Sequence, residues 1–303
     1  MPTTLTLAAG AARVVFVPEA GGSLVAFTWR GIEVLKSASP EAIAAGDPLG
    51  MSSYPLVPYS NRIAGARLAF EGGSHALRRN LPGHPHAIHG VGWQRRWRVS
   101  EHDAARARLE LDHVATGADA ADWPWPFRAV QELAVESNGE RACLVATLAI
   151  ENTGSRRFPC GLGWHPFFPC DPTTELAFAS DGVWRTDGSG LPTACERPEP
   201  WGFATLRPLP ADHLDNVFAG WAGEAVLHQA GRGLSVTLRA DAPCRHLVVY
   251  TPHDRRSIAL EPVSHVTDAF NRAARGDADT GMLLLEPGAR IACTMRIDAT
   301  PLP

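Results

Sequence analysis

Hydrophobic and polar residues alternate with a period of two along much of the chain. The alternation covers residues 108–113, 127–135, 234–238 and 291–297. A period of two places one set of side chains on the core face of a sheet and the other set on its solvent face. We therefore predict half-buried β-strands at these four places. Two other segments, 143–150 and 247–250, are apolar throughout and suit strands that are covered on both faces.

Short turn sequences rich in Gly, Asn, Asp and Pro separate these segments, at residues 71–73, 137–139, 152–154, 187–190 and 286–288. Helical candidates are few and short: residues 41–45, and residues 265–275 before Gly276. Many short strands with turns between them, and 25 prolines, favour an all-β fold over alternating βαβ units. We predict one large antiparallel β-sandwich in a single domain that spans residues 1–303.

Composition narrows the classes of partner. The 303 residues are 45% hydrophobic and 20% charged, with a net charge of −4 and a single lysine, Lys36. This balance provides no basic surface for nucleic acid or for an anionic membrane, so a small neutral molecule is the expected partner. The first ten residues lack the pattern of a secretory signal, and no apolar run approaches a membrane span of about 20 residues. We therefore expect a cytoplasmic protein.

The six cysteines are dispersed and form no Cys-x-x-Cys pair, which predicts reduced, packed thiols. The segment 84–90 contains three histidines, His84, His86 and His89. No carboxylate or cysteine lies near them and Pro85 interrupts their spacing, so we do not predict a metal site. His89 remains a candidate because Gly90 would let a ligand approach it closely, with Trp93 as an apolar wall.

Two polar positions could bind hydroxyl groups. Arg62 follows Asn61 between apolar residues, and its guanidinium is a fork of donors; an arginine paired with a structural carboxylate is the alternative reading. Asp215 lies in the segment 213–218 and is a possible hydroxyl acceptor, although a turn or cap role fits equally well.

Two further residues could carry proton transfer. His165 lies in the segment 161–168 among Trp164, Phe167 and Phe168, where an aromatic cleft could set its pKa near working pH and stack on a sugar ring; a core histidine is the alternative. Glu261 ends an apolar, strand-like run directly before Pro262. A buried carboxylate is costly unless it is paired or functional, and burial raises its pKa toward that of a useful base.

These motifs, in this order and approximate spacing, resemble the aldose 1-epimerase (galactose mutarotase) family over nearly the whole chain. The resemblance implies the family's large antiparallel β-sandwich and needs no cofactor or metal. It implies that Glu261 takes the proton of the anomeric hydroxyl while His165 protonates the ring oxygen of an aldose. The residues that it implies for sugar binding are Asn61, Arg62, His89, Asp215 and Trp164, and the position of Trp93 beside His89 adds it as a further candidate.

The chain departs from the family's usual pattern at two places. Val248 and Val263 occupy positions where a glutamine is often found. The segment from Glu261 to Asn271 also resembles a less characterised branch of the family rather than the galactose enzymes. The resemblance therefore leaves the choice of sugar open.

Three other functions are compatible with parts of the sequence. A sugar-binding or sensing module would keep the aromatic and hydroxyl-binding residues but would not need the His165 and Glu261 pair. A glycoside hydrolase needs two carboxylates, for which Asp215 and Glu261 are the candidates, with His165 remote. A hexose-6-phosphate 1-epimerase needs an arginine cluster for the phosphate, for which Arg95, Arg96 and Arg98 are the candidates.

Overall fold

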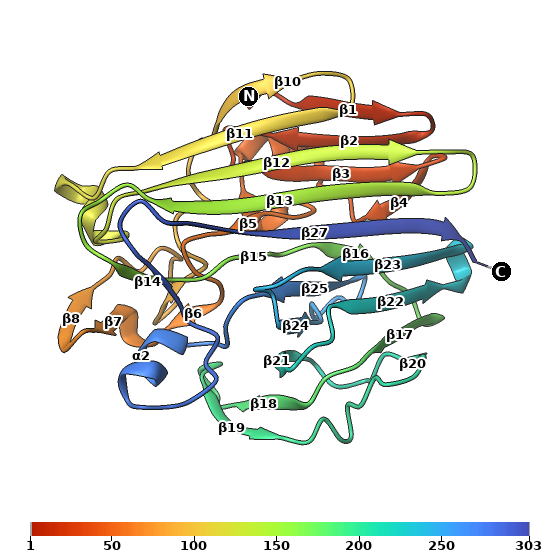
Figure 1. The fold of residues 1–303 in the computed structure, drawn as a ribbon. Coiled ribbons are helices and arrows are strands. Elements are labelled where there is room, and N and C mark those ends of the chain that lie inside the picture. Colours follow the sequence, from red (N-terminus) through yellow and green to blue (C-terminus); the bar gives the residue numbers. More distant parts are fainter. Residues whose placement is uncertain (1, 303) are drawn as a thin grey trace.

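The computed structural model describes residues 2–302 and shows antiparallel β-sheets with very little helix (Figure 1). Neighbouring strands of the large sheets run antiparallel. The predicted all-β antiparallel fold is thus confirmed. Within residues 2–302 no helix is long and apolar enough to span a membrane.

The largest sheet has nine strands, and its longest members form the upper half of Figure 1. In spatial order the strands are β10 (Arg98–His102), β11 (Arg106–His113), β12 (Phe127–Ser137), β13 (Ala142–Asn152), β27 (Arg290–Pro301), β23 (Leu234–Ala240), β22 (Glu224–Gln229), β17 (Thr174–Phe178) and β20 (Arg207–Pro208). Four of these strands, β11, β12, β23 and β27, contain the segments predicted from alternation. Their inward side chains, such as Leu109, Leu133 and Val236, are buried in the main hydrophobic core.

A second sheet of eight strands carries most of the candidate chemistry. Its order is β19 (Pro192–Glu196), β18 (Gly182–Thr186), β21 (Asp215–Ala219), β24 (His246–Tyr250), β25 (Ser257–Val263), β15 (Gly163–Trp164) and β5 (Pro55–Leu56), and β16 (Phe167–Pro169) also pairs with β25. Every residue of β25 is buried, and only Tyr250 of β24 is partly exposed. The apolar run 247–250 is therefore a covered strand, as predicted.

The remaining strands form smaller sheets. One has four strands, β1 (Leu5–Ala9), β2 (Ala12–Val17), β3 (Ser23–Trp29) and β4 (Ile32–Leu35). Three others have two strands each: β6 (Arg62–Ile63) with β9 (Ala87–Ile88), β7 (Arg67–Phe70) with β8 (Gly73–Ala76), and β14 (Phe158–Cys160) with β26 (Leu283–Leu285).

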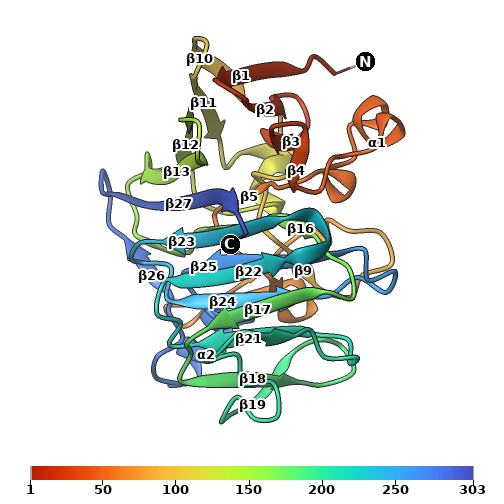
Figure 2. The same ribbon diagram turned by 90° about the vertical axis from the view of Figure 1, so that its right-hand side faces the viewer.

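Two α-helices occur within residues 2–302, α1 (Pro40–Ala45) and α2 (Ala269–Ala274), at opposite ends of the molecule in Figure 2. Four 3-10 turns complete the described elements: η1 (Pro48–Gly50), η2 (Ala64–Ala66), η3 (Gly117–Ala121) and η4 (Ala230–Arg232). Helix α1 matches its prediction and begins at Ser39, whose side chain accepts the N–H of Ala42.

The second predicted helix, residues 265–275, is shorter than expected. It begins only at Ala269 because Asp268 has a left-handed backbone (φ 57°) and its N–H donates to the carbonyl of Arg62 at 2.9 Å. The Asp268 side chain also accepts the N–H of Ala64 at 3.0 Å. These long-range hydrogen bonds override the local helix propensity and tie the segment to β6.

The predicted turns divide into two kinds. Residues 71–73, 137–139 and 187–190 join paired strands as hairpins, as expected. Residues 152–154 and 286–288 instead lead from one sheet to another, because β13 and β14 are not paired and β26 and β27 are not paired. A turn sequence shows where the chain reverses, but the partner of the next strand is decided by tertiary packing.

Candidate active site

A cavity of about 390 Å³ opens beside the eight-stranded sheet, large enough for a small ligand. Six residues singled out from the sequence line it together, although they come from segments far apart in the chain: Asn61, Arg62, His89, His165, Asp215 and Glu261. Phe167, one of the aromatic residues expected around His165, lies in the same wall. The wall also contains residues that the sequence did not single out as ligand contacts: Lys36, Tyr54, His84 and Tyr250, with Leu49, Leu81, Ile88 and Pro252.

Glu261 lies inside β25, opposite Val248 of β24. The expectation that the strand ends at Glu261 was wrong, because β25 continues through Pro262 to Val263 and Pro262 still lies opposite Leu247. Glu261 is therefore held by covered strands on both sides. Its side chain is only 3% exposed.

His165 contacts Glu261 directly, with 3.1 Å between Nε2 and Oε1. It lies between β15 and β16, and its backbone N–H donates to the carbonyl of Tyr54 at 3.1 Å. The imidazole lies between two aromatic rings, with centroids 4.7 Å away for Tyr54 and 4.6 Å away for Phe167. The ring is thus clamped in place on its two faces, with its edge against the carboxyl group.

Burial shifts the pKa values of this pair in opposite directions. It raises the pKa of Glu261 well above its usual range; the nearby Asp215 charge raises it further, while Arg62 opposes the shift. Burial lowers the pKa of His165 to about 3, although Asp215 partly counters this shift. Between these two values the coupled pair holds one proton in total. Both Glu261–imidazolium and neutral carboxyl–imidazole forms have this proton count, and the 3.1 Å between Nε2 and Oε1 is short enough for the proton to pass from one group to the other.

Two buried polar atoms of the pair have no hydrogen-bond partner among residues 2–302, Oε2 of Glu261 and Nδ1 of His165. Leaving such atoms unpaired costs free energy. Unpaired buried polar atoms are a feature of sites that bind polar ligands. The pair can therefore both accept and donate a proton within a site largely shielded from water.

His89 is held with one defined tautomer. Nδ1 of the His89 ring accepts the backbone N–H of Asn61 at 3.0 Å, and the backbone N–H of His89 donates to the Asn61 carbonyl at 2.8 Å. Burial, and then the neighbouring His165, lower the pKa of His89 well below its usual value, so the ring is neutral. Because Nδ1 is an acceptor, the proton of the neutral ring is on Nε2. His89 can thus donate one hydrogen bond to a ligand oxygen.

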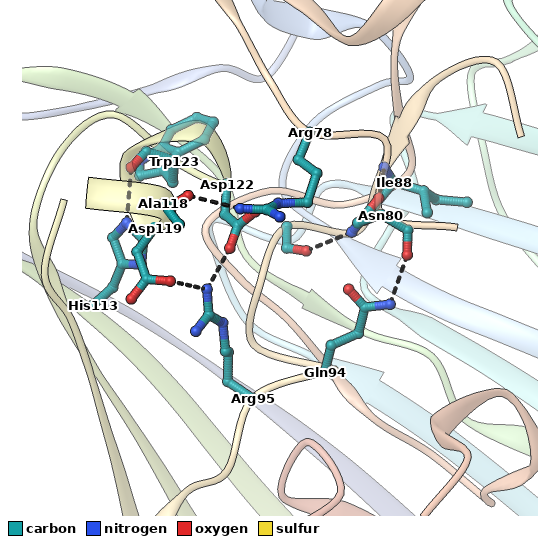
Figure 3. A network of polar contacts seen from close by, with 11 residues as sticks. Arg78, Asn80, Ile88, Gln94, Arg95, His113, Ala118, Asp119, Asp122 and Trp123 are labelled. Atoms are coloured by element: carbon teal, nitrogen blue, oxygen red, sulfur yellow. Dashed lines mark hydrogen bonds and ion pairs between the residues drawn. The ribbon is translucent and has the colours of Figure 1, made fainter. Parts of the chain in front are cut away.

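Asn80 fixes the loop that carries His89. Its side-chain amide donates to the carbonyls of Ile88 at 2.7 Å and Gly90 at 3.0 Å, and accepts the N–H of Ile88 at 2.9 Å. These three bonds bracket His89, whose backbone has the uncommon positive φ of 59°. Figure 3 shows Asn80 beside Ile88, with Gln94 donating to the Asn80 backbone. No pattern in the sequence indicates this role for Asn80.

Arg62 and Asp215 form an ion pair in the cavity wall, with 2.8 Å between Nη2 and Oδ2. Nη1 of Arg62 also donates to Oδ1 of Asn61 at 3.1 Å. Asp215 begins β21 and lies opposite Tyr250 of β24. The alternative reading of Arg62 as a carboxylate-paired residue therefore describes part of its contacts, although both partners line the cavity.

Trp93 and Trp164 do not line the cavity, so the structure does not place them where they could stack on a ligand. Trp93 is 1% exposed and packs behind the wall, 5.6 Å from the Tyr54 ring, while its indole N–H donates to Gly90 at 3.2 Å. Trp164 is 2% exposed in the core. Trp164 ends β15 and packs in the hydrophobic core, whereas His165, the next residue, lines the cavity. The aromatic wall is instead made by Tyr54, Phe167 and Tyr250.

The two phenols in that wall stay protonated near neutral pH. Burial raises the pKa of Tyr54 well above its usual value, and the Glu261 charge adds to the shift. Burial also raises the pKa of Tyr250, with Asp215 as the next cause. Both side chains therefore offer a hydroxyl group beside an apolar ring.

The other arrangements considered from the sequence are not assembled here. Arg95 pairs with Asp119 and Asp122, as Figure 3 shows, and does not line the cavity. Arg96 lies 3.7 Å from Glu19 and Arg98 pairs with Glu110, so these three arginines do not form an anion site in the cavity wall. No group of three or more metal-binding side chains was found within residues 2–302.

Comparisons with known proteins identify the family and the fold of the chain. The family profile described as Aldose 1-epimerase matches residues 3–298. The uncharacterized protein YphB of Escherichia coli K12 is 30% identical over 304 residues, covering 97% of this chain and 98% of YphB. A crystal structure of a candidate aldose 1-epimerase from Escherichia coli K12 has a TM-score of 0.87 at 25% identity, with both chains fully covered. Galactose 1-epimerase from Lactobacillus acidophilus NCFM has a TM-score of 0.75 at 17% identity, covering 98% of this chain and 94% of that one.

Proposed function

Since the chain belongs to the aldose 1-epimerase family, we propose that it interconverts the α and β anomers of a free aldose by opening and closing the sugar ring. The observation that supports this proposal most directly is the 3.1 Å contact between His165 and Glu261 at a cavity wall. The anomeric hydroxyl oxygen and the ring oxygen of an aldose are bonded to the same carbon. Two groups that exchange protons with these oxygens must therefore be close neighbours.

The proposed reaction needs only this pair. The Glu261 carboxylate takes the proton of the anomeric hydroxyl, the bond between C1 and the ring oxygen breaks, and the His165 imidazolium gives its proton to that oxygen. The product is the open-chain aldehyde, with neutral Glu261 and neutral His165. Rotation about C1–C2 exposes the other face of the aldehyde, and ring closure returns both protons. Atoms and charges balance without a cofactor.

The other cavity residues would bind and orient the sugar. We propose that His89, through Nε2–H, and Arg62 donate to the ring oxygen and neighbouring hydroxyls, with Asn61 as a further polar contact. Asp215 would accept a hydroxyl through the oxygen that Arg62 does not occupy. The rings of Tyr54, Phe167 and Tyr250 would cover the apolar face of the sugar, the task first expected of Trp93 and Trp164.

Two alternatives lose support from the geometry. Glycoside hydrolysis by Asp215 and Glu261 would leave His165 apart from the acid, yet His165 touches Glu261. A sugar-binding module would have no use for a buried acid/base pair whose unpaired polar atoms cost stability.

The free thiol state of all six cysteines fits our proposal that the protein works in the reducing cytoplasm.

The direct test is the rate of anomer exchange. Freshly dissolved α-glucose and α-galactose, together with pentoses and 6-deoxy sugars, would be followed by polarimetry with and without the protein, and sugar binding would be measured by saturation-transfer NMR. We expect faster mutarotation of at least one aldose than in buffer or with heat-denatured protein. Sugar binding without faster exchange would instead identify a binding module.

The pKa shifts predict an unusual pH profile. Activity needs one proton on the pair, and this state persists from the lowered pKa of His165, about 3, to the raised pKa of Glu261. Acid removes the base by adding a second proton, whereas alkali removes the acid by taking the last one. We therefore expect kcat/KM to be level between about pH 5 and pH 8. An acid limb near the ordinary histidine pKa of about 6.5 in the measured profile would contradict this assignment.

Asn80 offers a test of His89. Replacing Asn80 by Ala removes three hydrogen bonds that hold the His89 backbone, and we expect kcat/KM to fall about 10-fold. In a His89→Ala background the same change should have little further effect, because Asn80 acts through His89. Gln94→Ala is the matched control, because it removes a contact to the Asn80 backbone but leaves the three hydrogen bonds of the Asn80 side chain in place. Equal losses in both backgrounds would show that Asn80 does not act through His89.

A further inference from the structure

Lys36 is the only lysine among the 28 lysines and arginines of the chain, and it lines the cavity. It directly follows β4, and its backbone N–H donates to the carbonyl of Phe167 at 2.9 Å. Its ammonium group lies 5.7 Å from the centre of the Phe167 ring, the ring that also packs against His165. Backbone pairing therefore places this cation beside the proposed catalytic pair.

No carboxylate within residues 2–302 lies within 4 Å of the Lys36 ammonium group. The charges of the arginine and acidic side chains in the cavity wall are all compensated. Arg62 pairs with Asp215, and Glu261 shares one proton with His165, so each of these pairs is neutral overall. The cavity thus carries one uncompensated positive charge, in a chain whose net charge is −4.

We propose that Lys36 makes the cavity selective for an aldose that carries an anionic group, a carboxylate or a phosphate monoester, away from its anomeric carbon. This proposal rests on the proposed epimerase function and names the class of its substrate. It differs from the expectation of a neutral ligand, which came from the net charge of the whole chain. The cation that matters is the one in the cavity, since a low-dielectric wall strengthens its attraction for an anion.

A lysine suits this task differently from the arginines used elsewhere in the chain. Its ammonium is a compact point charge on a flexible stem, able to follow an anionic group at the end of a sugar. Apolar residues, Leu49, Leu81 and Pro252, also line the cavity and would limit the water that competes for the anion. The arginine cluster first considered for a phosphate, Arg95, Arg96 and Arg98, is outside the cavity and satisfied by other carboxylates.

The experiment compares kcat/KM for anomer exchange of glucose, glucuronate and glucose 6-phosphate, with wild type and Lys36→Met. Methionine keeps the length of the stem and removes the charge. We expect the wild type to prefer at least one anionic sugar, and Lys36→Met to lower the ratio of anionic to neutral kcat/KM by about 10-fold or more. Lys36→Arg should restore part of the ratio. The anion whose ratio falls further is the one that the site is built for.

Arg96→Met is the matched control, because it removes one exposed positive charge outside the cavity and should leave the ratio unchanged. An unchanged ratio in Lys36→Met, or a wild type that prefers glucose to both anionic sugars, would overturn the proposal. If the protein accelerates exchange of none of the three, nor of the galactose, pentoses and 6-deoxy sugars tested above, the epimerase proposal fails separately. Calorimetric titration of wild type and Lys36→Met with the same sugars then still decides the charge selectivity, since weaker binding of the anions alone supports it and equal binding refutes it.

Discussion

Glu261→Gln is expected to lower kcat/KM for anomer exchange at least about 100-fold and, at the same time, to raise the melting temperature at neutral pH. The amide has almost the shape of the carboxyl group but cannot take a proton from the anomeric hydroxyl. The loss should fall on kcat, because the groups proposed to bind the sugar remain in place. Polarimetry at saturating sugar measures the first effect, and thermal unfolding measures the second.

The stability gain follows from the direction of the Glu261 pKa shift. Its pKa is raised in the folded protein, so its contribution is most favourable below its unfolded pKa and is lost as pH rises toward the folded value. Glutamine has no charge to desolvate and escapes this loss. The difference in melting temperature between Glu261→Gln and wild type should therefore widen as pH rises from about 4 toward the raised pKa.

Asp298→Asn is a matched control with the opposite expected sign. Burial of Asp298 opposes its ionisation, but hydrogen bonds from Arg296 outweigh this effect and lower its pKa. Its amide variant should therefore be less stable than wild type at neutral pH, and equally active because Asp298 does not line the cavity. A Glu261→Gln variant that keeps wild-type activity would remove the proposed base.

The strands were predictable because the alternation of apolar and polar residues shows which face of each strand is buried. Leu109 and Val236 are buried, and the alternation alone predicts this without knowledge of the neighbouring strands. Pairing was not predictable in this way. The turn at 152–154 looks like the one at 137–139, yet only the latter closes a hairpin, because β14, the strand after residues 152–154, pairs with the distant β26.

The site shows the same division. His165 and Glu261 stood out because a polar group in an apolar segment needs a partner, and each is placed against the other. Tyr54 and Lys36 reach the cavity from strand ends whose local sequence carries no such conflict. The aromatic character of Trp164 did not distinguish a cavity wall from the core, and in the structure Trp164 packs in the core while the adjacent His165 lines the cavity. Local composition thus predicts which groups are unusual, whereas only the sheet shows which groups meet.

His165→Ala is the complementary test, and we expect a loss in kcat/KM of at least about 100-fold. The ring oxygen loses its proton donor, while Glu261 can still act as a base. The residual rate should therefore rise with pH as Glu261 ionises through its raised pKa, whereas the wild-type rate is level below that pKa and falls above it. The space left between Tyr54 and Phe167 could admit free imidazole, so added imidazole should restore part of the rate.

A buried histidine outside the cavity separates this chemistry from simple loss of packing. His246 is 7% exposed, burial lowers its pKa to about 4, and it does not line the cavity. His246→Ala should reduce stability as a comparable core truncation, yet keep kcat/KM near wild type and show no response to imidazole. Equal activity losses in the two variants, or a His165→Ala variant with the level wild-type pH profile, would show that His165 supports the fold without transferring the proton.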